Sequence, residues 1–145
     1  ALSLELMELV APIVEQLEAD WTGDDGGALV RRLVSDYVDF WDAHGPVLRI
    51  LLLRADEGEP RFRQIRRDYN APFMAAMVAK VRRAQAEHRL VATLDAEATA
   101  GAILAVLDRL PNYREGFERR GTSRDAMIET VALLLQSSLD GESLA

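Results

Sequence analysis

Side chains with metal-binding or nucleophilic chemistry are few in this sequence, and they lie far apart. The two histidines, His44 and His88, belong to no H-x-x-x-H or E-x-x-H pair, so the ligands of a helical metal site are missing. The absence of cysteine excludes disulfides and thiolate chemistry. No nucleophile elbow, phosphate-binding loop or dinucleotide-binding fingerprint occurs. We therefore expect no metal, no cofactor and no enzymatic activity.

The aromatic side chains form a more informative set, because they fall on four predicted helical segments. Several have polar tips, and a buried polar tip needs a hydrogen-bond partner. Asn70 and Asp108 stand in otherwise apolar stretches, where an unpaired polar group costs about 1–3 kcal/mol or more. Helix kinks at Pro72 and Pro111 would leave room between the helices. Aromatic and polar groups around such a space are typical of a small-molecule pocket.

We predict an elongated, largely apolar ligand-binding pocket lined by Tyr37, Phe40, Trp41, Asn70, Phe73, Met77, Asp108 and Tyr113. Trp41 and Phe73 would stack on the ligand or enclose it, and the flexible Met77 would adapt to its shape. The polar groups of Asn70, Asp108 and Tyr113 would hold one end of the ligand. The alternative is that the aromatics simply fill a closed core.

The composition indicates one domain over residues 1–145. The apolar fraction of 49% excludes a disordered segment, and the scarcity of Thr and Ile favours helix over strand. Acidic side chains (24) exceed basic ones (17), and the resulting net charge of −7 repels nucleic acid and favours neutral or cationic ligands over anions. The longest apolar run is far short of the ~20 residues of a membrane-spanning helix. No signal peptide is visible, so we expect a cytoplasmic protein.

The elements that must position these residues are predicted to be helices, in an all-α antiparallel bundle of about six to seven. The clearest amphipathic pattern runs from Leu29 to His44, and Gly45-Pro46 should end that helix. Val47–Ala55 is apolar nearly all round, which predicts a short buried helix. Pro72 should interrupt the long helix that follows.

The last two long helices are predicted over Ala96–Leu110 and Ser123–Leu139. Asp95 should cap the first, Thr122–Asp125 has the form of a capping box for the second, and Asp140-Gly141 should stop it. Both helices have more apolar surface than one core contact uses. We therefore expect a homodimer through these helices, with an interface near Met127, Val131, Leu134 and Leu135.

Four pieces of the sequence stand in an order and spacing that resemble one family. They are Tyr37–Trp41 with His44 and Leu48-Arg49, the stretch from Phe62 through Pro72-Phe73, the stretch Gln85–Leu90, and Leu94–Ala100 opening a helix rich in small residues. Together they make the chain from Leu4 to Leu139 similar to the effector-binding half of a TetR-family transcriptional regulator.

The resemblance implies a ligand-binding and dimerisation domain of a regulator, expected to be a repressor, with a small apolar or aromatic effector. DNA would be bound only through a helix-turn-helix head preceding Ala1, which this chain lacks. Ligand binding would shift the first helix, so that the two heads of the dimer no longer match successive major grooves. Two alternatives stay open: a helical enzyme or carrier acting on an apolar molecule, and a purely structural dimeric bundle.

Overall fold

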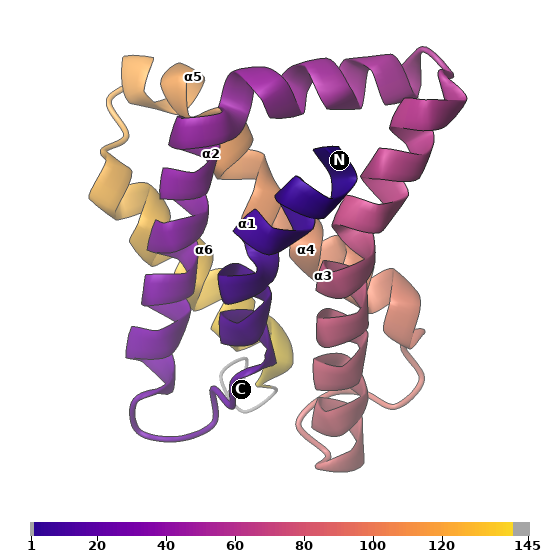
Figure 1. The fold of residues 1–145 in the computed structure, drawn as a ribbon. Helices are drawn as coiled ribbons and strands as arrows, with labels where there is room; N and C mark the ends of the chain where they lie inside the picture. The colour runs from indigo at the N-terminus through magenta and orange to yellow at the C-terminus, as the bar shows by residue number, and fades with distance from the viewer. Residues whose placement is uncertain (1, 141–145) are drawn as a thin grey trace.

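The computed structural model describes residues 2–140 as six helices joined by short loops (Figure 1). They are α1 (Leu2–Glu18), α2 (Gly26–Asp56), α3 (Pro60–Ala86), α4 (Ala96–Asn112), α5 (Arg114–Arg119) and α6 (Arg124–Leu139). The predicted all-α bundle is thereby confirmed, and residues 2–140 contain no strand. None of the helices in this range is long and apolar enough to cross a membrane.

The second helix continues through Gly45-Pro46 instead of ending there. In Figure 1 it rises along one side of the bundle, bends and then crosses the top as an upper arm. The prediction of a separate, buried helix over Val47–Ala55 is wrong, because this arm is covered on one side only. Its buried side chains are Leu48, Leu51 and Ala55. Its exposed apolar side chains are Val47, Ile50 and Leu53. Pro46 permits a bend, while the packing of the buried stripe keeps the backbone helical.

Local signals set the starts of the last two long helices as predicted. The Asp95 side chain accepts a hydrogen bond of 2.8 Å from the amide three residues later. The Ser123 hydroxyl does the same at 3.1 Å, so Ser123, not Thr122, caps α6. That helix ends at Leu139, and Gly141, which was expected to stop it, lies outside the described residues.

Each of the first four helices contains a proline: Pro12, Pro46, Pro72 and Pro111. The pattern around Pro72 predicted one kinked helix or two nearly coaxial ones, and α3 is a single helix through Pro72, whereas α4 runs past its predicted end to Asn112. A proline removes one intrahelical donor and allows a helix to bend. The candidate site lies between α2, α3 and α4, which all contain such a position.

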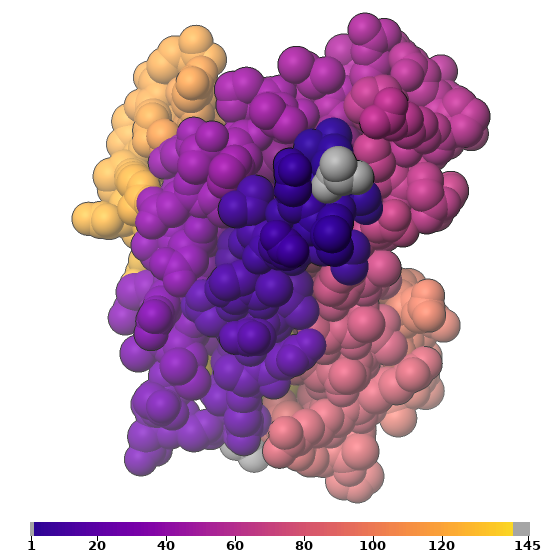
Figure 2. Space-filling view, in the orientation of Figure 1, coloured from indigo at the N-terminus to yellow at the C-terminus, as the bar shows by residue number. Residues whose placement is uncertain are grey.

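The first helix lies between α2 and α3 on the face shown in Figures 1 and 2, with α4 and α6 behind. Side-chain hydrogen bonds fasten it to both neighbours. Ser3 Oγ donates to Asp68 Oδ2 of α3 at 3.1 Å, and Gln16 Nε2 donates to Asp36 Oδ2 of α2 at 2.8 Å. Apolar side chains of every helix except α5 form one continuous core.

Candidate ligand-binding site

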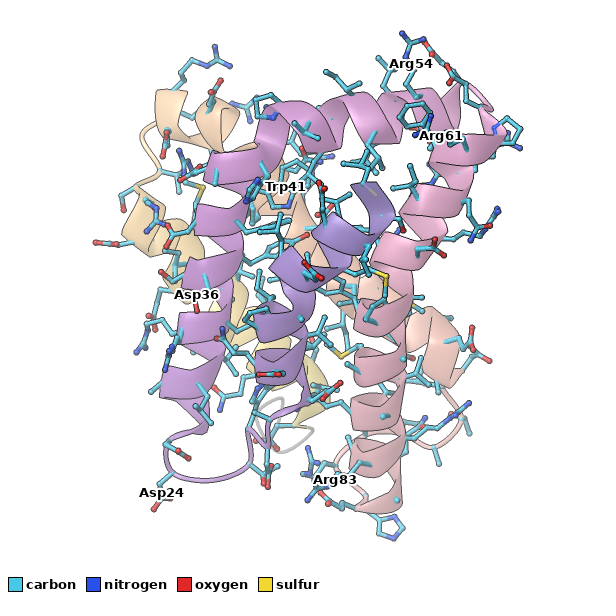
Figure 3. The ribbon with its side chains drawn as sticks, in the orientation of Figure 1. Asp24, Asp36, Trp41, Arg54, Arg61 and Arg83 are labelled. Atoms are coloured by element: carbon cyan, nitrogen blue, oxygen red, sulfur yellow. The ribbon has the colours of Figure 1, made fainter. Side chains whose placement is uncertain are left out.

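A cleft of about 290 Å³ opens between α2, α3 and α4. Trp41, one of its residues, stands near the upper end of the rising part of α2 (Figure 3). Aromatic and aliphatic side chains dominate the wall, which consists of Tyr37, Trp41, Leu48, Leu51, Leu52, Tyr69, Asn70, Phe73, Met74, Gly101, Leu104, Ala105, Leu107 and Asp108. A mainly apolar wall with a few polar groups is the usual composition of a small-molecule site.

One polar pair in the cleft is complete. The Tyr37 hydroxyl donates a hydrogen bond of 2.6 Å to Asp108 Oδ1. Burial of its ring, with smaller effects of Tyr69 and Asp108, raises the pKa of Tyr37 well above its usual value. Tyr37 therefore keeps its proton at neutral pH and acts as the donor. The second carboxylate oxygen of Asp108 has no hydrogen bond to a described residue.

Two other polar tips at the cleft make no hydrogen bond of normal length and angle among residues 2–140. The Tyr69 hydroxyl and the Trp41 indole N–H are buried, and each interacts only more weakly with the Tyr37 hydroxyl. An unsatisfied buried donor costs about 1–3 kcal/mol, so folded proteins retain few of them. Burial also raises the pKa of Tyr69, which keeps its hydroxyl protonated. Because both residues line the cleft, an acceptor atom bound there would remove part of this cost.

The aromatic rings hold one another in place. Phe73 meets Tyr37 edge-on with ring centroids 6.1 Å apart, and Tyr69 lies 5.6 Å from Phe73. Phe40 stacks on Tyr37 at 6.3 Å and on Tyr69 at 6.5 Å. Such pairs contribute about 0.5–1.5 kcal/mol beyond the burial of their area. The wall is thus ordered without a ligand.

Five of the eight residues predicted for the pocket meet at the cleft: Tyr37, Trp41, Asn70, Phe73 and Asp108. The other three lie elsewhere. Phe40 packs against the ring cluster without lining the cleft, and Met77 is fully buried in the core. Tyr113 is 52% exposed in a separate groove, because it stands in the turn between α4 and α5, where the helical phase of α4 has ended.

Nine cleft residues were not in the predicted set, among them Tyr69, Met74 and Gly101. Tyr69 was recognisable, since it lies one turn before Phe73 and so on the same face of the helix. Gly101 gave no signal in the sequence beyond its place in a helix rich in small residues. No atom lies within 4 Å of a Cβ built on it, so it leaves open space at the wall of the cleft.

Three of the four residues predicted for a dimer interface belong to the core of a single chain. Met127, Val131 and Leu135 are at most 3% exposed, because this stripe of α6 faces α2 and α4. These three side chains face the core of the single chain, and the position of a dimer interface stays a prediction. Leu134 does lie on the surface, 51% exposed, beside Leu133 at 54%.

The two histidines stand apart from each other and from the cleft. His44 lies beside Phe40, with ring centroids 5.1 Å apart, and His88 follows the end of α3 with a left-handed φ of 58°. Within residues 2–140, no group of three or more His, Asp or Glu side chains is placed to hold a metal ion.

The fold and the cleft can now be compared with known proteins. Residues 13–144 match a family model described as "Tetracyclin repressor-like, C-terminal domain". Because the match covers most of the sequence, the chain belongs to this TetR-like family of C-terminal domains, as its resemblance predicted. Comparison with curated proteins and with solved structures gives no match.

Proposed function

We propose that residues 1–145 form the effector-binding and dimerisation domain of a TetR-like transcriptional repressor. Its effector is a small, largely apolar or aromatic molecule that binds in the cleft. The observation that carries this proposal is the pair of buried donors, on Trp41 and Tyr69, that make no hydrogen bond of normal length and angle in a mainly aromatic and aliphatic wall. A closed structural core satisfies its buried donors. The proposed domain is cytoplasmic and acts without catalysis, metal or cofactor.

Each cleft residue contacts a different part of the ligand, according to its position in the wall. Trp41 and Phe73 enclose the apolar part of the ligand, and Asn70, which is exposed, contacts it at the mouth of the cleft. Asp108 accepts a hydrogen bond through its second oxygen while Tyr37 holds the first. Phe40 supports this wall from outside the cleft through its contacts with Tyr37 and Tyr69.

Ligand binding is proposed to act through α1. This helix is bonded to α3 by Ser3 and to α2 by Gln16, and the same two helices form opposite parts of the cleft. A ligand that favours a wider spacing of α2 and α3 therefore shifts α1. In a complete regulator α1 would follow the helix-turn-helix head, through which alone DNA is bound.

Dimerisation is proposed to use the exposed faces of α4 and α6. These faces carry small or apolar side chains that no part of the described chain covers: Ala98, Ala102, Ala105, Leu133 and Leu134. A two-fold pairing of the two helices with their copies would bury this surface in a four-helix contact.

The dimer is tested by sedimentation equilibrium of a Leu133→Glu/Leu134→Glu variant, which should be monomeric. Leu53→Glu is the matched control, because Leu53 is equally exposed, at 58%, on the upper arm of α2. It should leave the dimer intact. A double variant that stays dimeric with wild-type affinity places the interface elsewhere.

Ligand binding is tested with the neutral, aromatic probe N-phenyl-naphthylamine. In a Trp21→Phe background, the probe should change Trp41 fluorescence and raise the melting temperature. Gly101→Phe puts a ring into the open space of the cleft and should abolish both effects. Ala79→Phe puts the same ring beside a different hollow and should change neither. Unaltered binding by the Gly101→Phe variant would contradict the proposed site.

A further inference from the structure

A second hollow adjoins the cleft and differs from it in charge. It is an open groove of about 800 Å³ between the bend of α2 and the corner where α4 meets α5. Five arginines line it, against the two carboxylates of Asp42 and Glu115. We call it the arginine groove, after Arg49, Arg109, Arg114, Arg119 and Arg120.

Most of this positive charge is not neutralised within the chain. Arg114 pairs with Asp42 at 2.5 Å and with Glu118 at 3.1 Å. The other four arginines of the groove have no hydrogen bond or ion pair to any residue in the range 2–140. Elsewhere on the surface, arginines such as Arg31 and Arg66 pair with carboxylates at 2.7 and 2.5 Å. Of the six arginines that make no hydrogen bond or ion pair within residues 2–140, four therefore line this groove, on a chain of net charge −7.

One of these guanidinium groups is stacked on an aromatic ring, and a second lies at the outer limit of such a contact. The Arg109 guanidinium carbon lies 4.1 Å from the ring centroid of Tyr113, and that of Arg49 lies 6.0 Å from the Trp41 ring. Stacking fixes the plane of a guanidinium and leaves its N–H edge free. That edge matches a carboxylate, sulfonate or phosphate and can donate two parallel hydrogen bonds.

Trp41 joins the arginine groove to the cleft, because it lines both. A molecule lying across this indole would have its apolar part in the cleft and its other end among the arginines. We infer that the effector is an amphipathic anion, with an aromatic or aliphatic body and a negatively charged head group. This inference rests on the proposed function, since the apolar body occupies the same cleft.

The net charge of the chain does not oppose this inference. Charges more than about 8 Å away are largely screened at physiological ionic strength, so a head group in the groove experiences mainly the groove's own side chains. The composition led us to expect a neutral or cationic ligand. The local excess of arginine over carboxylate in the groove favours an anionic head group instead.

The test compares two probes with one aromatic frame, anilinonaphthalene sulfonate and N-phenyl-naphthylamine, which lacks the sulfonate. The dissociation constant of each is measured from probe fluorescence. The sulfonate should bind at least about tenfold more tightly, as one charge-assisted hydrogen bond implies. Dodecanoate should displace the bound sulfonate probe at a lower concentration than dodecanol does. That result would show that the preference for an anionic head group includes a carboxylate.

Paired variants locate the effect. Arg119→Gln/Arg120→Gln removes two guanidinium groups from the α5 side of the groove, away from the rings of the cleft, and should lower sulfonate affinity about tenfold without changing that of the neutral probe. Arg61→Gln/Arg82→Gln removes the same charge from unpaired arginines of α3 and should change neither constant. Arg61 stands at the corner of the molecule away from α5 (Figure 3).

The outcomes separate the inference from the proposed function. Equal affinities for the two probes, or an equal loss in both double variants, would overturn the anionic effector and leave the apolar cleft standing. Binding of neither probe would overturn the proposed function and this inference together. Only a sulfonate preference that depends on the arginines of the groove supports it.

Discussion

The two tryptophans are equally buried, yet they stand in regions of different construction. Trp21 is 5% exposed and Trp41 is 4% exposed. The Trp21 indole N–H donates to the Gln16 carbonyl oxygen at 3.3 Å, and the Lys80 ammonium lies 4.0 Å from its ring centroid. The Trp41 N–H makes no hydrogen bond of normal length and angle, and Trp41 lies between the cleft and the arginine groove.

This difference indicates that the Trp21 region holds the helices together, whereas the Trp41 region has the features of a ligand-binding surface. A hollow of about 620 Å³ also adjoins Trp21, but each cation on its wall already has a partner. Lys80 donates to the Ala19 carbonyl oxygen at 2.5 Å, Arg83 bonds to Glu87, and Arg89 donates to a backbone carbonyl. Burial and a nearby hollow thus do not identify a ligand site, whereas buried donors without a normal hydrogen bond and unpaired charges distinguish the Trp41 region.

The largest expected effect comes from a substitution that disrupts the packing around Trp21. A Cβ on Gly26 would stand 1.8 Å from the Trp21 carbonyl oxygen, which is backbone and cannot rotate away. Gly26→Ala should therefore lower the free energy of unfolding by about 3 kcal/mol, the upper range for overpacking. In Gly27→Ala the nearest atom is 3.7 Å away, at the flexible end of Gln136, and stability should change little. Urea denaturation of both variants makes the comparison, and equal stabilities would contradict the close contact.

A smaller difference is expected when each indole is replaced by phenylalanine. Both substitutions remove similar volume, but only Trp21→Phe removes a hydrogen bond, and its cation–π contact at 4.0 Å is closer than the 6.0 Å contact of Arg49 with Trp41. Trp21→Phe should therefore destabilise the chain by about 1–2 kcal/mol more than Trp41→Phe. Equal losses in thermal denaturation would show that the Trp41 indole N–H is satisfied within the folded chain.

Gly101→Ala should separate stability from binding in the Trp41 region. The added methyl group meets no atom within 4 Å, and alanine favours a helix interior over glycine by about 0.5–1 kcal/mol. The variant should be more stable by this amount and should bind N-phenyl-naphthylamine more weakly, since the cleft narrows. A stabilised variant with undiminished binding would argue that the probe binds outside the cleft.

The last comparison concerns Lys80, the only lysine of the sequence. Burial lowers the pKa of Lys80 from 10.5 to about 8. Between these values the unfolded chain holds more protons than the folded one, so stability rises with pH there relative to Lys80→Met. Below about pH 8 both states are protonated and the full destabilisation by the buried charge is present. Isotope labelling of lysine gives one side-chain signal, whose titration midpoint should be near 8; a midpoint near 10.5 contradicts the burial effect.

Local patterns predicted the helix class and the starts of α4 and α6, because caps and periodicity depend on near neighbours. They failed where the structure depends on packing between residues that lie far apart in the sequence. Gly45-Pro46 has the local chemistry of a helix stop, but the buried stripe beyond it keeps α2 continuous. Phe73 and Met77 share one stripe of α3, yet only Phe73 lines the cleft. Periodicity predicts which face of a helix a side chain lies on, but not how deeply that side chain is buried. It also cannot predict which of the two indole N–H groups forms a hydrogen bond.

The continuity of α2 restricts how the length of this chain can change in evolution. Because α2 is one helix from Gly26 to Asp56, a residue inserted before Pro46 would rotate everything beyond it by about 100°. Leu48 and Leu51 would leave the core, and the upper arm would present a different face. Insertions in the loops before α2 or before α4 would be absorbed locally. Relatives of this domain should therefore vary in length at those loops, and within α2 only by whole helical turns.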